Sequence, residues 1–167
     1  MKNFRDMPLA AGLLASIAIL VFSYYRYASG QPERRFQEEL IAVLVTNTPT
    51  IRPEDLTAFS WDKVCAFVPY ISQKEIERIS GKPFARFDEL IPWADNDGYW
   101  SLVFLAGDVV ALSVRIPRME FGDYELGGDW GRCELRGQAL FRIAVDGRPG
   151  LAPRRIELIN GSSRIVH

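Results

Sequence analysis

The chain has very little of the chemistry on which most enzyme active sites depend. Only one of its 167 residues is a histidine, and this residue, His167, is the last in the chain. A terminal side chain is poorly held in place unless something packs against it, which argues against Ser-His-Asp or Cys-His catalysis and against a histidine-rich metal site. The two cysteines, Cys65 and Cys133, are too few for a structural zinc centre of the usual kind. We therefore expect neither a metal nor a cofactor.

An excess of charge of either sign is also missing. The chain carries 20 basic and 21 acidic side chains, for a formal net charge of −1. Acidic and basic residues alternate, as in Glu33-Arg34-Arg35. Nucleic-acid binding requires a clustered positive surface, so this pattern argues against it. An apolar fraction of 48% and a charged fraction of 25% are typical of a globular protein.

Residues 8–25 contain no charged side chain, whereas Lys2 and Arg5 precede them and Arg26 follows. At about 1.5 Å per residue, a helix of this length is about 27 Å long, just enough to cross the core of a bilayer. Tyrosines gather at its end, over residues 24–27, where aromatic rings suit the headgroup level. The pattern predicts a transmembrane anchor that contacts the membrane through residues 8–27. A buried core helix is the less favoured alternative because such a helix usually has a polar stripe.

A cleaved signal peptide is the main alternative to an anchor. Ala28-Ser29-Gly30 offers small residues for a peptidase, with cleavage near Gly30 and a secreted or periplasmic product. The apolar run is longer than a usual signal sequence, and Arg26 interrupts the approach to that site, so we favour the uncleaved anchor. Basic residues on the two sides of the span are nearly balanced. A short N-terminal tail normally stays inside and the long C-terminal domain is exported, which predicts a single-pass protein of the bacterial inner membrane with its C-terminal domain in the periplasm. The reverse topology is the alternative.

The rest of the chain alternates between helix and strand patterns. Apolar residues at helical spacing predict a helix over residues 33–46. The apolar run at 64–68 predicts a central strand within residues 60–68 that is covered on both faces. Ser72 and Glu75 predict the capped start of a second helix, which Gly81 ends.

Strand patterns dominate after this second helix. Residues 99–105 and 109–116 predict a hairpin that turns at Gly107-Asp108. A further strand is predicted over residues 132–145, with a bulge or bend at Gly137, and a short edge strand over residues 155–159. We therefore predict an α+β protein in which residues 1–30 form the tail and anchor. Residues 31–167 would then form an extracytoplasmic domain with a mainly antiparallel sheet and two helices.

The most distinctive string is Trp61-Asp62-x-x-Cys65-x-x-x-Pro69-Tyr70. One interpretation is structural: the aromatic residues fill the core or its rim, and Asp62 accepts hydrogen bonds from the backbone at a strand end. The functional interpretation places Asp62, Tyr70 and Arg118 around a small pocket. Trp130, within the glycine-rich residues 127–131, is a further candidate for contact with a partner. The candidate binding residues are therefore Trp61, Asp62, Tyr70, Arg118 and Trp130.

This string, read as W-D-x-V-x-x-x-x-P-Y, resembles the signature of small exported or lipid-anchored bacterial proteins of uncharacterised function. The agreement continues through the strands at 99–107 and 109–118 and through Gly122-Asp123-Tyr124, and it covers about residues 58–126. No cysteine directly follows the apolar segment, which excludes a lipoprotein anchor here. The resemblance implies export and a shared fold, but it implies no activity.

Other acidic and cysteine patterns have ordinary structural explanations beside the functional ones. Asp95-Asn96-Asp97-Gly98 lacks the ligand register of an EF-hand, so we expect a turn there. Nothing sets the separation of the carboxylate pairs Asp88-Glu89 and Asp123-Glu125. Cys65 and Cys133 are candidates for a disulfide if the domain is exported, and buried free thiols are the alternative.

Incomplete catalytic sets together with an export signal favour a protein without enzymatic activity. We expect a membrane-anchored binding or accessory protein of the cell envelope whose domain binds a protein partner or another envelope component. The alternative is an envelope hydrolase that uses carboxylates only, which would need two facing carboxylates about 5–10 Å apart in an open cleft.

Overall fold

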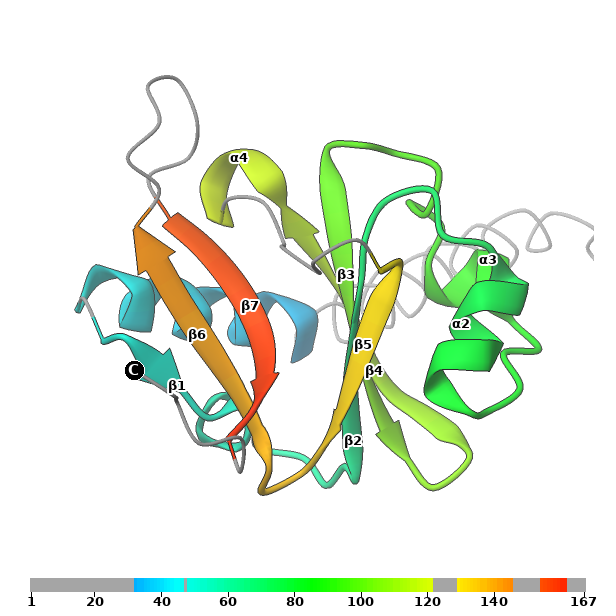
Figure 1. The fold of residues 1–167 in the computed structure, drawn as a ribbon, viewed down its shortest axis with the longest axis horizontal. Helices are drawn as coiled ribbons and strands as arrows, with labels where there is room; N and C mark the ends of the chain where they lie inside the picture. The colour runs from blue at the N-terminus through cyan, green and yellow to red at the C-terminus, as the bar shows by residue number, and fades with distance from the viewer. Residues whose placement is uncertain (1–31, 47, 122–128, 146–153, 162–167) are drawn as a thin grey trace, which may run out of the picture.

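Two antiparallel sheets form the centre of the molecule (Figure 1). The computed structural model describes residues 32–46, 48–121, 129–145 and 154–161. The strands lie in the orders β1-β6-β7 and β4-β3-β2-β5, which confirms the predicted α+β class. Their bounds are β1 Thr50–Ile51, β2 Lys63–Phe67, β3 Tyr99–Ala106, β4 Val109–Pro117, β5 Gly131–Leu135, β6 Ala139–Val145 and β7 Arg154–Asn160.

The helical segments are short, apart from the helix over residues 32–45. The others are η1 Pro53–Leu56, α2 Gln73–Ser80, α3 Phe87–Leu90 and α4 Arg118–Phe121. Within the part of the chain that the structure describes, no helix is both long and apolar enough to cross a membrane. The anchor predicted over residues 8–27 lies outside that part.

Strand β2 is buried on both of its faces, as its apolar run predicts. Successive side chains of a strand point to opposite faces of the sheet. Val64 and Ala66 join the core shared with the 32–45 helix and the β1-β6-β7 sheet. Cys65 and Phe67 join the second core, which α2 and the segment around α3 cover. The four-stranded sheet is therefore the middle layer of the fold.

The 32–45 helix packs on the larger core through one apolar stripe. Phe36, Leu40 and Leu44 recur every fourth residue and are buried, as expected for one face of a helix with about 3.6 residues per turn. The ring of Phe36 meets that of Phe104 edge to face at 5.3 Å between centroids. Most of the charged side chains of this helix lie away from this stripe and are exposed.

Helix α2 has the predicted ends. The Ser72 hydroxyl accepts a hydrogen bond from the Glu75 backbone N–H at 3.2 Å, and Gly81 ends the helix with a φ of 70°. Its backbone N–H donates to the carbonyl of Glu77. The Glu75 carboxylate does not complete a reciprocal capping box, because it forms an ion pair with Arg78 at 2.9 Å. Half of the predicted box is therefore present.

The single strand predicted over residues 132–145 is wrong. This segment forms β5 and β6, which belong to different sheets, and Gly137 turns the chain between them with a φ of 78°. The nearly buried Glu134 links the two sheets: it accepts hydrogen bonds from Arg132 on its own strand at 2.7 Å and from Asn160 on β7 at 2.9 Å. Both halves carry alternating apolar residues, so periodicity could not reveal the change of sheet.

Side chains of the 32–45 helix cover part of the free edge of β4. Strand β4 lies at one end of its sheet. The backbone N–H of Arg115 donates to the Glu33 carboxylate at 2.9 Å, and its carbonyl accepts from the Gln37 side chain. A bulge also interrupts the β3–β4 register. Exposed edges promote pairing with other chains, so these contacts hinder such pairing over the second half of β4.

Candidate functional site

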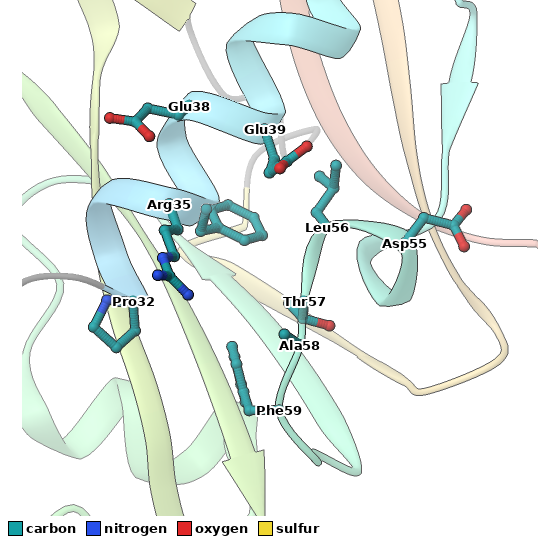
Figure 2. Close-up of a pocket in the computed structure, with 10 residues that line it drawn as sticks. Pro32, Arg35, Glu38, Glu39, Asp55, Leu56, Thr57, Ala58 and Phe59 are labelled. Atoms are coloured by element: carbon teal, nitrogen blue, oxygen red, sulfur yellow. The ribbon is translucent and has the colours of Figure 1, made fainter.

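A groove lies between the 32–45 helix and the chain over residues 55–59 (Figure 2). Its volume is about 830 Å³. A smaller hollow of about 490 Å³ shares Glu39, Asp55 and Leu56 with it. Both volumes fall in the range of roughly 300–1,000 Å³ that is usual for ligand sites. We call these two adjoining hollows the helix groove.

The floor of the helix groove is apolar and its wall is held by hydrogen bonds. Phe36 and Leu56 are buried at its base, and Phe59 is half-buried beside them. The Thr57 hydroxyl accepts from the Trp61 indole N–H at 2.8 Å and donates to the carbonyl of Pro53 at 3.2 Å. These bonds fix the turn that forms one wall, so the groove does not depend on a bound molecule for its shape.

The charged side chains of the helix groove are spread along its length. Figure 2 shows Arg35 between Pro32 and Phe59, and Asp55 at the opposite end. The carboxylate of Glu38 points away from that of Asp55. A carboxylate-only hydrolase needs two acids that face one another across the substrate.

Trp61 and Asp62 have structural roles at one end of β2. Trp61 is buried in the larger core, and Arg136 lies over its ring at 5.3 Å from the centroid. The Asp62 carboxylate accepts from the backbone N–H of Gly107 at 2.6 Å, which holds the turn between β3 and β4. The structural interpretation of this part of the motif accounts for both side chains.

Tyr70, Arg118 and Trp130 lie at the other end of the same sheet. Tyr70 is 60% exposed and has a φ of 63°, uncommon for a residue other than glycine. Trp130 is 49% exposed, and its carbonyl accepts from the backbone N–H of Val68 at 3.2 Å. Arg118 donates to the carbonyl of Asp97 at 2.7 Å.

The proposed pocket of Asp62, Tyr70 and Arg118 is therefore not formed. Strand β2, Lys63–Phe67, separates Asp62 from the other two, and a strand of this length spans about 16 Å at 3.3 Å per residue. Tyr70 and Trp130 remain exposed aromatic residues at one end of the sheet. Neither lines the helix groove.

Cys65 and Cys133 are joined by a disulfide bond, which is the first of the two predicted alternatives for these residues. They are direct partners in the antiparallel pairing of β2 with β5, and their Cα atoms are 4.0 Å apart. Opposite residues of antiparallel strands come closest at about 4.5 Å when they are not themselves hydrogen-bonded. The sheet register thus brings together two residues that are 68 positions apart in the sequence.

The other acidic patterns within the described residues do not form a cluster of possible metal ligands. In the Asp95–Gly98 loop, the Asn96 side chain accepts from the backbone N–H of Gly98 at 2.8 Å, which is the expected turn. Glu89 pairs with Arg86 on the surface. No group of three or more possible metal ligands occurs among the described residues. Asp123, Glu125 and the glycine-rich stretch up to residue 128 lie outside them.

Carboxyl groups with a lowered pKa lie outside the helix groove. A hydrogen bond from Arg78 lowers the pKa of Glu75, and one from the Phe84 backbone N–H lowers the pKa of Glu77. A hydrogen bond from Lys82 lowers the pKa of Asp108. These shifts come from hydrogen bonds and ion pairs on the surface around α2.

Sequence reasoning missed the helix groove. Its walls come from two segments, and each looks like an ordinary amphipathic surface by itself. The available signal was the pair Glu38-Glu39 on the helix and Glu54-Asp55 at the start of the following loop. Comparison with protein-family models, curated proteins and solved structures finds no match. The function must therefore be argued from the residues of this chain.

We expect Asp62→Ala to lower the free energy of unfolding by about 1 kcal/mol, because Gly107 loses the acceptor for its backbone N–H. Asp62→Asn keeps an acceptor oxygen and should lose less. Urea denaturation of the full chain in detergent measures both. Equal loss in the two variants would show that the hydrogen bond does not hold the turn.

Proposed function

We propose that this chain is a single-pass membrane-anchored protein of the bacterial envelope, whose domain over residues 31–167 binds a protein partner without catalysing a reaction. The Cys65–Cys133 disulfide is the observation that carries the location. Disulfides form and persist in oxidising compartments and are rare in the cytosol. An oxidised cysteine pair therefore supports the export that the apolar segment over residues 8–25 predicts.

The helix groove supports binding as the activity. It combines a buried apolar floor with exposed charged side chains on its rim. Interfaces commonly have an apolar centre within a polar surround. The carboxylates of Glu38 and Asp55 point away from one another, which supports binding rather than hydrolysis by that pair.

Fractionation tests the location. We expect the full-length chain to stay in the membrane pellet after washing with high salt and carbonate, because an uncleaved span keeps it in the bilayer. A cysteine-reactive probe that cannot cross the inner membrane should label a single added cysteine, Ala85→Cys, in intact spheroplasts. A soluble mature form that begins near Gln31 would contradict the anchor, and labelling only after lysis would contradict the orientation.

Affinity capture tests the binding activity. The tagged full chain, solubilised in a mild detergent, should retain one envelope protein that is absent from captures with an unrelated tagged membrane protein. Immunoblotting of the reciprocal capture provides the control. Reproducible failure to retain any envelope protein, even after crosslinking in intact cells, would overturn the proposed function.

A further inference from the structure

The helix groove is long as well as deep. Its lining residues on the helix begin at Pro32 and continue through Glu39 to Val43. The eleven helical steps from Pro32 to Val43 correspond to about 16 Å at 1.5 Å per residue. A polypeptide in extended conformation advances about 3.3 Å per residue, so a segment of about five residues would match this length. A compact small molecule would fill only one of the two hollows.

The charges of the groove favour a cation where its two hollows meet. Glu39 and Asp55 line both hollows, and both side chains are exposed. Neither takes part in an ion pair within the described residues, whereas Arg52 nearby is paired with Glu54 at 3.1 Å. Figure 2 places Arg35 toward the other end, beside Pro32.

We infer that the helix groove binds an extended segment of the partner protein that carries a lysine or arginine flanked by apolar side chains. The cation lies between Glu39 and Asp55, and an apolar side chain packs on the half-buried Phe59, next to the buried Phe36 and Leu56. Complementary charges contribute mainly to specificity and to the association rate, while the contact with Phe59 contributes through the apolar area that it buries. This inference deepens the proposed function and rests on it.

Defined peptides test the chemistry of the occupant. The probe is the fluorescein-labelled peptide GSLKLKLKSG, and its binding to the full chain in nonionic detergent is followed by fluorescence anisotropy. The acidic peptide GSLELELESG and the peptide GSSKSKSKSG, which lacks apolar side chains, are the controls. We expect both controls to bind at least tenfold more weakly than the probe. Equal binding of the three peptides would overturn the inference.

Matched variants test the place of binding. The double variant Glu39→Lys/Asp55→Lys should weaken probe binding at least tenfold. Asp88→Lys/Glu89→Lys makes the same change in charge on α3 and should bind as the unaltered chain does. Ala58→Trp fills the groove from an exposed position and should also weaken binding. If both double variants bind alike and Ala58→Trp has no effect, the groove is not the site.

Residues 162–167 of this chain are the competing occupant. These residues include a cation with apolar neighbours, Arg164, Ile165 and Val166. The preceding Gly161 lies close to the smaller hollow, because a Cβ on it would meet the side chain of Leu140, which lines that hollow. A variant that ends at Gly161 should bind the probe as the full chain does. Tenfold tighter binding by that variant would assign the groove to these residues and overturn the inference. If the full chain and the Glu39→Lys/Asp55→Lys variant capture the same partner equally well, the groove is not the binding site, but the proposed binding function still stands.

Discussion

Replacing Phe104 by alanine is expected to lower the free energy of unfolding by about 3–5 kcal/mol, the usual cost of deleting a buried aromatic side chain. Phe104 is fully buried on β3. Its ring meets those of Phe36, Phe59 and Trp61 edge to face, at 5.3, 5.5 and 5.3 Å between centroids. Each such pair adds roughly 0.5–1.5 kcal/mol beyond the buried area. The expected loss is large beside a typical total stability of about 5–15 kcal/mol.

Urea denaturation of the full chain in detergent, followed by tryptophan fluorescence, measures this loss. Phe87→Ala is the matched control, because Phe87 is only half-buried and packs at the margin of the second core. It should cost clearly less. The Phe104 ring also packs the 32–45 helix against the sheet, and this packing positions the helix groove. Phe104→Ala should therefore weaken binding of the GSLKLKLKSG probe as well. A loss below about 1 kcal/mol would show that this cluster does not hold the core.

Loss of the Cys65–Cys133 disulfide is expected to have a comparable effect. The bond closes a loop between residues 68 positions apart, for which the entropy of the unfolded chain predicts a stabilisation of about 4 kcal/mol. For a domain of this size, a loss of that magnitude corresponds to a fall in Tm of roughly 10–15 °C. Cys65 is buried and Cys133 half-buried, so reduction should require a strong dithiol or partial unfolding.

Thermal unfolding with and without dithiothreitol measures the effect. The variant Cys65→Ala/Cys133→Ala should unfold near the temperature of the reduced protein and should not respond to the reductant. Non-reducing mass spectrometry should find the two cysteine peptides linked in protein isolated from the membrane. Free thiols in that protein would remove the main support for an oxidising compartment, and with it the support for export.

Short-range features of this fold could be read from consecutive residues. Ser72 and Gly81 mark the ends of α2 because capping uses a side chain and a backbone conformation within one turn of the helix. Gly107 marks the β3–β4 turn for the same local reason, with a φ of 59°. The apolar run at 64–68 predicts burial on both faces, since only a covered strand tolerates apolar side chains in both directions. Each signal and its consequence lie within a few residues.

The assignment of strands to sheets required the tertiary structure. Residues 131–145 have the alternation of a single strand, yet Gly137 divides them between two sheets. Alternation records which side chains are buried and carries no information about which strand lies alongside. The disulfide is an intermediate case: an even number of cysteines predicts that a pair can form. Only the register of β2 with β5 brings Cys65 and Cys133 together.

The candidate sites likewise separate what neighbouring residues predict from what tertiary packing decides. The Trp61–Tyr70 motif is contiguous in sequence, but β2 runs through its middle and carries Asp62 and Tyr70 to opposite ends of a sheet. The helix groove arises from the opposite situation, since Glu39 and Asp55 belong to separate segments that packing on Phe36 and Leu56 brings side by side. The sequence by itself determined the local elements, the balance of charge and the absence of usual catalytic sets. Tertiary packing decided which side chains share a surface, because that depends on contacts between segments that no local pattern records.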